Sequence, residues 1–219
     1  MTITVAGYPR SGTVWVARLL GDALDYPVTG LKGGRGTIAA EGFDRKGNGR
    51  VIHAHILPDH RLSNQGKVVL VVRDPRDVAV SAAAFWEWTL EETLDKMIDG
   101  PGPVELPPWQ DYMDAWRAVN VPTVLYEDLQ VCPQLVLEKL LEQLGEHPRR
   151  PLHRVIWRQS FAVKRYEIEQ NGDGYPFGRE AQLQHLRHGT SGEWEQRLSP
   201  TMKQRALDVW GDYLVWLDY

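Results

Sequence analysis

The hydrophobic positions of the chain repeat with two different periods, and together they predict strands that alternate with helices. Residues 67–72 form a continuous apolar run, which is typical of a strand buried on both faces of a parallel sheet. Shorter apolar segments predict further strands, and apolar residues three or four positions apart predict helices between them. The predicted strands are 3–7, 51–57, 67–72 and 123–126, and the predicted helices are 15–24, 75–88, 109–119, 135–144 and 202–217.

This alternation indicates an α/β fold of three layers, in which helices cover both faces of a central parallel sheet. We expect a single domain over residues 1–219, because 42% of the residues are hydrophobic and can build one core. Three segments rich in glycine, proline or polar residues, 28–50, 99–108 and 170–192, are predicted to be loops. We expect the last of them to be a mobile lid that closes over a bound ligand.

Composition narrows the classes of function. The net charge of −4 argues against nucleic acid or an anionic membrane as the main partner. Cys132 is the only cysteine, so no internal disulfide can form, and no cysteine–histidine grouping has zinc-site spacing. No apolar run is long enough for a membrane span, and the first residues lack the features of a signal peptide. We therefore expect a cytoplasmic protein without a membrane span.

The turn between the first predicted strand and helix has the composition of an anion-binding loop. Gly7 and Gly12 have the spacing of the glycines in a nucleotide P-loop, and the N–H groups at the helix start favour a bound phosphate. P-loop ATP enzymes carry a lysine after the second glycine, where this chain has Thr13. A different cation, Arg10, lies inside the turn beside Ser11. The turn alone is as compatible with a plain strand-to-helix connection as with a phosphate site.

The residues around this turn resemble the 5'-phosphosulfate loop of the sulfotransferase family, Pro-Lys-Ser-Gly-Thr-Thr-Trp. Arg10 replaces the family's lysine and Val14 its second threonine, so the positive charge and the backbone N–H are kept. The resemblance implies a P-loop-like site for the donor 3'-phosphoadenosine 5'-phosphosulfate (PAPS). The residues implied to bind its 5' end are Arg10, Ser11, Gly12, Thr13, Val14 and Trp15.

Two later segments resemble the parts of sulfotransferases that bind the donor's 3'-phosphate. The first resembles the family's Arg-Asn-Pro-Arg-Asp-Val-x-Val-Ser, which implies that Arg73 and Ser81 bind this phosphate. An arginine after a buried strand and a hydroxyl about two turns into the next helix can converge on one phosphate. The second resembles the glycine-rich segment near the family's C-terminus, which implies the same role for Arg187, His188 and Gly189.

Without the resemblance, structural roles stay open for the first of these segments. Arg73 could pair with Asp74 or Asp77, and Ser81 could be a small packing residue. Asp74 before Pro75 is also a typical helix start, with aspartate at the cap and proline in the first turn. We expect Asp77 to be structural and to help hold this helix start.

Three aromatic residues resemble those that bind the donor's adenine in the family. Tyr126 ends the fourth predicted strand and begins a Tyr-Glu-Asp-Leu segment, and Phe161 follows Ser160. With Trp15, the resemblance implies an adenine sandwich. Any one of these rings alone would more often belong to the hydrophobic core.

Two histidines lie two residues apart in the predicted strand 51–57. In a strand, His53 and His55 would point to the same face. Residues 55–58 resemble the end of the family's Lys-Thr-His-Leu-Pro segment, which implies that His55 is the general base and leaves His53 as a lesser catalytic candidate. A metal-binding pair is a weaker alternative, because no third ligand lies nearby in the sequence.

The resemblance implies transfer of the sulfuryl group from PAPS to an acceptor hydroxyl, with release of adenosine 3',5'-bisphosphate (PAP). By analogy with phosphoryl transfer, His55 would take the hydroxyl proton and Arg10 would stabilise the leaving oxygen, without a metal ion. The acceptor could be a small molecule, a glycan or a peptide. Two alternatives stay open, a P-loop kinase-like ATP enzyme that uses magnesium and a non-catalytic nucleotide-binding module.

Overall fold

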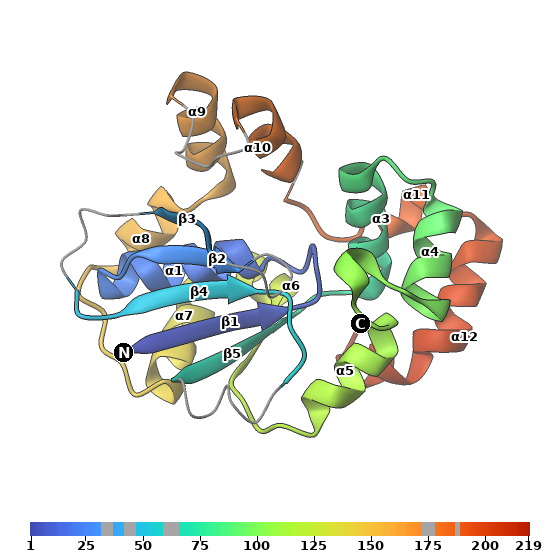
Figure 1. The fold of residues 1–219 in the computed structure, drawn as a ribbon, viewed down its shortest axis with the longest axis horizontal. Coiled ribbons are helices and arrows are strands. Elements are labelled where there is room, and N and C mark those ends of the chain that lie inside the picture. The colour runs from blue at the N-terminus through green and yellow to red at the C-terminus, as the bar shows by residue number, and fades with distance from the viewer. Residues whose placement is uncertain (32–36, 42–46, 59–65, 172–177, 187–188) are drawn as a thin grey trace.

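The strands that the structure describes form one six-stranded sheet in the order β3-β2-β4-β1-β5-β6 (Figure 1). Neighbouring strands from β2 to β6 pair in parallel, and only β3 runs antiparallel, at the edge beside β2. The strands are β1 (Thr2–Gly7), β2 (Val28–Leu31), β3 (Thr37–Glu41), β4 (Arg50–Ala54), β5 (Lys67–Val72) and β6 (Thr123–Leu125). The structure is a computed structural model that describes residues 1–31, 37–41, 47–58, 66–171, 178–186 and 189–219.

The prediction of a loop over 28–50 is wrong in part, because β2 and β3 lie within it. Strand β2 pairs with β4, with Val28 opposite Val51 and Gly30 opposite His53. It has only four residues, and its parallel partner comes later in the chain. So short a strand carries no local period that would reveal it. The sheet is therefore mixed at one edge rather than wholly parallel.

One face of the sheet is covered by three helices, α1 (Thr13–Leu24), α7 (Pro133–Gln143) and α8 (Leu152–Arg158). The alternation of side chains along the strands sorts the apolar residues between the two faces. Val69 and Val71 of β5 face this layer, whereas Leu70 and Val72 face the opposite one. Both faces of β5 are buried, as its continuous apolar run predicts.

The other face is covered by four helices, α3 (Pro75–Trp86), α4 (Leu90–Asp99), α5 (Trp109–Arg117) and α12 (Pro200–Trp216). Trp109, Trp116 and Trp210 are fully buried in this layer. Figure 1 shows that these helices extend beyond the ends toward which β1 and β4 point. Helices on both faces of a largely parallel sheet confirm the predicted three-layer α/β fold.

Helices also occupy parts of the other two predicted loops. Within 99–108, α4 ends at Asp99 and a short 3₁₀ helix, η1, spans Pro103–Glu105. The prediction of a loop over 170–192 is wrong for its central part, which forms α10. Residues 172–177 and 187–188 lie outside the described residues, so the lid stays a prediction. The remaining helices are α6 (Tyr126–Val131), α9 (Phe161–Asn171), α10 (Gly178–Leu186) and α11 (Trp194–Arg197).

Helix α3 starts as predicted. Asp74 is its cap, with a carboxylate oxygen 2.9 Å from the backbone nitrogen of Arg76, and Pro75 is the first helical residue. The guanidinium of Arg76 also donates to this carboxylate, with a shortest N–O distance of 2.6 Å. Because α3 begins so soon after β5, Arg73 is held at the end of a central strand.

Four segments with predicted site residues leave the sheet on the same side, at the carboxyl ends of the strands, because the strands before them are parallel. Strand β1 leads into the glycine turn, β4 into His55, β5 into Arg73 and β6 into Tyr126. In open sheets of this type, ligands bind at the carboxyl ends of the strands.

Candidate active site

The turn between β1 and α1 depends on two residues with left-handed backbone angles, Arg10 with φ of 72° and Gly12 with φ of 92°. A Cβ atom on Gly12 would lie 2.5 Å from Cδ2 of Tyr126, so only glycine fits beneath this ring. The backbone N–H of Ser11 closes the turn by donating to the carbonyl of Tyr8 at 3.1 Å. The start of α1 thereby lies at the carboxyl ends of the strands, where its N–H groups and dipole favour an anion.

Three buried donors around the turn have no hydrogen-bond partner among the described residues. They are the hydroxyl of Ser11, the indole N–H of Trp15 and Nε of Arg73. Buried donors are rarely left unpaired, because a lost hydrogen bond to water is costly. A ligand rich in oxygen acceptors, such as a phosphorylated nucleotide, fits this donor set.

Arg10 and Ser81 come from different elements and meet beside the turn. Nε of Arg10 donates to the hydroxyl of Ser81 at 3.1 Å, and the guanidinium lies 4.5 Å from the ring centre of Phe85. Ser81 and Phe85 are four residues apart in α3, so they share a face of this helix. A predicted 5'-end residue is therefore in direct contact with a predicted 3'-phosphate residue.

Arg73 joins the turn to the glycine-rich segment near the end of the chain. Its two terminal nitrogens donate to the carbonyls of Arg10, at 3.2 Å, and Thr190, at 2.8 Å. Its guanidinium also lies 4.4 Å from the ring centre of Tyr126. The alternative in which Arg73 pairs with Asp74 or Asp77 is not observed in the described part of the chain.

Asp77 has a structural role, but a different one from that expected. Its two carboxylate oxygens accept hydrogen bonds from the backbone nitrogens of Gly192, at 2.6 Å, and Trp194, at 3.1 Å. Burial raises the pKa of this carboxyl, and the bond from Gly192 opposes that rise. The segment after Gly189 is thus held against α3. Arg187 and His188 lie outside the described residues.

The aromatic residues predicted to bind adenine lie around the same segment. The rings of Trp15 and Tyr126 are in edge contact, with centres 5.7 Å apart and planes at 70°. Phe161 lies against Gly189, where a Cβ atom would come within 2.7 Å of its ring. The structure therefore joins Trp15 directly to Tyr126 and brings Phe161 to the predicted phosphate-binding Gly189.

His55 lies just after β4, beside the start of the glycine turn between β1 and α1. Its Nδ1 is 2.8 Å from the carbonyl oxygen of Gly7. A carbonyl only accepts, so Nδ1 carries the hydrogen in this bond and Nε2 keeps its lone pair. Burial lowers the pKa of His55, the Gly7 carbonyl opposes that change, and nearby Arg10 lowers the pKa further. A neutral imidazole with a free Nε2 can accept a proton.

His53 has a different environment from His55. It lies inside β4, is only 7% exposed, and packs over Gly30 of β2, where a Cβ atom would be 2.6 Å from Nε2. Since β4 ends at Ala54, the predicted strand 51–57 is too long, and strand alternation does not relate the two histidines.

Two residues that hold the site were not identified from the sequence. Gln130 of α6 binds the backbone of Gly189 and the hydroxyl of Ser191. The indole N–H of Trp116 donates to the carbonyl of Ile56, next to His55, at 3.2 Å. Gln130 lies four residues after Tyr126, and this spacing was its only signal in the sequence.

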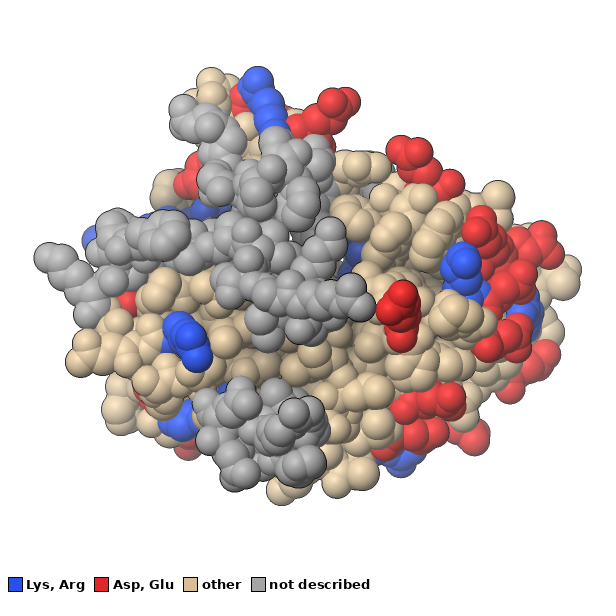
Figure 2. Space-filling view, viewed as in Figure 1, with Lys and Arg blue, Asp and Glu red and all other residues tan. Residues whose placement is uncertain are grey.

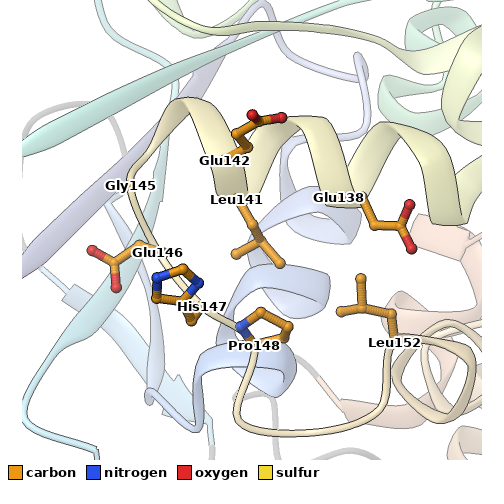
Figure 3. Close-up of a pocket in the computed structure, with 8 residues that line it drawn as sticks. All are labelled: Glu138, Leu141, Glu142, Gly145, Glu146, His147, Pro148 and Leu152. Atoms are coloured by element: carbon orange, nitrogen blue, oxygen red, sulfur yellow. The ribbon is translucent and has the colours of Figure 1, made fainter.

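A pocket of about 330 Å³ lies away from these residues, between α7 and α8 (Figure 3). It is lined by Glu138, Leu141, Glu142, Gly145, Glu146, His147, Pro148 and Leu152, none of which belongs to the predicted site. No group of three histidine, cysteine or carboxylate side chains in the described ranges is placed to hold a metal ion.

Comparison with known proteins identifies the family. A family model described as "Sulfotransferase domain" matches residues 46–213, well over half of the chain. The chain belongs to this sulfotransferase family. Mouse "Sulfotransferase 1 family member D1" is 25% identical in an alignment 239 positions long, which covers 90% of this chain and 78% of the relative. Rat "Sulfotransferase 1A1" is 23% identical in an alignment 241 positions long, which covers 93% of this chain and 81% of the relative.

Solved sulfotransferase structures share the fold. Mouse sulfotransferase SULT7A1, complexed with PAP, superposes with a TM-score of 0.75 at 19% identity, covering 97% of this chain and 84% of that one. Retinol dehydratase, in complex with androsterone and inactive cofactor PAP, gives 0.68 at 16% identity, covering 97% and 80%. The predicted membership of the PAPS-dependent sulfotransferase family is confirmed. Across the described helices, none has the length and apolar character of a membrane span.

Proposed function

We propose that this sulfotransferase binds PAPS at the turn after β1 and uses His55 as the general base that activates an acceptor hydroxyl. The observation that carries the proposal is the hydrogen bond from Nδ1 of His55 to Gly7. Gly7 is the residue at which the phosphate turn begins, so the base and the anion site are joined. The bond also leaves Nε2 as the only ring nitrogen that can take a proton.

The donor's two charged ends would meet different sets of residues. The N–H groups of the turn and the hydroxyl of Ser11 would bind the 5' end, and Arg73 with Ser81 would bind the 3'-phosphate. The unpaired donors on Ser11, Trp15 and Arg73 support this assignment. Arg187 and His188 are proposed as further ligands of the 3'-phosphate, on sequence grounds. Trp15, Tyr126 and Phe161 would contact the adenine.

PAPS supplies an activated sulfuryl group, and the protein's part is positioning and charge stabilisation. His55 would accept the acceptor's hydroxyl proton at Nε2 as the oxygen attacks sulfur. Arg10 would stabilise the charge that grows on the leaving phosphate oxygen. Its bond to Ser81 holds the guanidinium beside the turn. We propose no metal ion in this reaction, and no direct catalytic role for the buried His53.

We propose that the acceptor is a hydroxyl-bearing small molecule with a flat apolar part. A row of rings leads away from Arg10. Phe85 contacts Trp86 edge-on with centres 4.9 Å apart, and Trp86 stacks on Trp88 at 5.2 Å and 18°. All three rings are half-buried, so part of each faces solvent. A glycan or a peptide hydroxyl is the other class of acceptor.

Binding measurements test the donor assignment. Calorimetry should show that PAP binds much more tightly than AMP, which lacks the 3'-phosphate. Arg73→Ala should weaken PAP binding about tenfold or more, because a hydrogen bond to a charged group contributes about 1.5–3 kcal/mol. The matched control is Arg197→Ala, which removes an exposed arginine. Equal affinities for PAP and AMP would exclude the 3'-phosphate site.

Activity measurements separate the alternatives. Labelled PAPS offered with a panel of phenols, alcohols, sugars and peptides should yield a sulfated product. Tighter binding of ATP with magnesium than of PAP would favour a kinase-like enzyme. Tight PAP binding without turnover on any acceptor would favour a non-catalytic module. A single domain over residues 1–219 and a cytoplasmic location stay predictions.

A further inference from the structure

One face of the short helix α6 lies against both phosphate-binding segments. Tyr126 and Gln130 are four residues apart in α6 and therefore lie on the same face. The ring of Tyr126 covers Gly12 of the turn, and the side chain of Gln130 reaches Gly189 and Ser191. Nε2 of Gln130 also lies 3.4 Å from the hydroxyl of Tyr126.

The amide of Gln130 fits the backbone and side chain that it meets. Its Nε2 donates to the carbonyl of Gly189, and its Oε1 accepts from the hydroxyl of Ser191. The contact with Gly189 determines the orientation of the Gln130 amide, because a carbonyl oxygen can only accept a hydrogen bond and so must face the NH₂ group. Few side chains offer a donor and an acceptor side by side, and neither methionine nor an ionised glutamate does.

The segment from 189 to 192 needs such support to keep one shape. Gly189 and Gly192 both have left-handed angles, with φ of 64° and 83°, and no helix or strand includes them. An irregular segment loses conformational entropy when it is ordered, so its shape depends on side chains from elsewhere. Arg73 binds Thr190, Asp77 binds Gly192, and Gln130 binds the two residues that flank Thr190.

We propose that Gln130 is a positioning residue that holds residues 189–191 in the shape required for the 3'-phosphate end of the donor. It acts on the residues that directly follow Arg187 and His188, and on Gly189, which packs on Phe161. The inference rests on the proposed function. It assigns Gln130 to recognition of the bisphosphate nucleotide and not to sulfuryl transfer.

The test is Gln130→Met, which keeps the length of the side chain and removes the hydrogen bonds to Gly189 and Ser191. The dissociation constant for PAP and the KM for PAPS should rise about tenfold, the effect of two neutral hydrogen bonds. AMP binding should change less than about twofold, and kcat should stay close to that of the parent. The control is Gln134→Met, which removes an exposed glutamine of α7 that pairs with Glu138.

A double-mutant cycle adds a readout that general destabilisation would not move. Ser191→Ala alone should weaken PAP binding about two- to threefold. In combination with Gln130→Met it should add almost nothing, because the two side chains share one hydrogen bond. Gln130→Glu keeps the acceptor for Ser191 but places a carboxylate oxygen, which cannot donate, against the Gly189 carbonyl. It should weaken PAP binding at least as much as Gln130→Met.

The outcomes separate this inference from the proposed function. A parent protein that binds PAP no better than AMP overturns both. A parent that prefers PAP, with a preference unchanged in Gln130→Met, overturns the role of Gln130 alone. Equal losses for PAP and AMP together with a lower melting temperature would show a merely structural residue. Additive effects of Gln130→Met and Ser191→Ala would also overturn the inference.

Discussion

The two ring nitrogens of His55 have different environments, so substitution of this residue tests the proposed mechanism. Nδ1 is engaged by Gly7, and Nε2 is left to accept a proton. His55→Ala should lower kcat by about 10²- to 10⁴-fold, the usual contribution of a positioned base. PAP affinity, measured by calorimetry, should stay near that of the unmutated protein, because other residues are proposed to bind the donor.

Two other histidines serve as comparisons for this prediction. His147 is exposed and lines the remote pocket in Figure 3, so His147→Ala should leave turnover unchanged. His53→Ala should be milder than His55→Ala, because His53 packs inside the sheet over Gly30. Normal turnover in His55→Ala with collapse in His53→Ala would move the base two residues upstream.

The pKa of His55 also predicts the pH dependence of the reaction. Burial lowers this pKa below its usual value of about 6.5, and the base is the neutral form. Activity should therefore fall only as pH drops through the lowered pKa. A pH profile of kcat/KM should place the acid limb below the pKa of free histidine, and an acid limb at or above that value would contradict the assignment.

The contact between the glycine turn and α6 depends on a residue without a side chain. Gly12→Ala would place a Cβ atom 2.5 Å from the ring of Tyr126 at a backbone angle that disfavours alanine. We expect a loss of about 1–3 kcal/mol in the free energy of unfolding, as for other overpacked sites, and weaker PAP binding. Denaturant unfolding and calorimetry measure the two effects.

Gly211 provides a control of opposite sign for the same substitution. It lies inside α12, and a Cβ atom there would be 3.6 Å from Cδ1 of Leu207, an ordinary contact. Gly211→Ala should raise the free energy of unfolding by about 0.5–1 kcal/mol, because alanine is the better helix former. If Gly12→Ala were as stable as Gly211→Ala and bound PAP normally, Tyr126 would not cover the turn as described.

Across the molecule, the acidic surface lies apart from the proposed anion site. Figure 2 shows carboxylates gathered over α4 and α12, and the exposed ones are Glu91, Glu92, Asp95, Asp99, Asp208 and Asp212. Arg10 and Arg73 instead lie at the carboxyl ends of the strands, near the unpaired donors of Ser11 and Trp15. The overall negative charge of the chain is therefore compatible with an anionic donor.

These two arginines and the turn amides lead us to predict turnover without a metal ion. Sulfuryl transfer to the best acceptor should proceed at the same rate in excess chelator, measured with labelled PAPS. Added magnesium should not increase the rate. Loss of turnover in chelator with recovery on magnesium would support the kinase-like alternative.

Local features of the sequence were enough for several elements and for their order. The structure matches the apolar run of β5, the Asp74–Pro75 start of α3 and the glycine spacing of the turn between β1 and α1. Each depends on hydrogen bonds and packing preferences between residues close in the chain, so composition and spacing reveal it. The motif order likewise identified the family.

Only the tertiary structure decided which distant residues meet. Strand β2 exists because β4 lies beside it, and Nδ1 of His55 has a partner because parallel pairing brings Gly7 to the same edge. The contact of Gln130 with Gly189 joins residues 59 positions apart, and that of Asp77 with Gly192 joins residues 115 positions apart. Such contacts carry no local period or spacing, because they arise from the packing of elements that are separate in sequence.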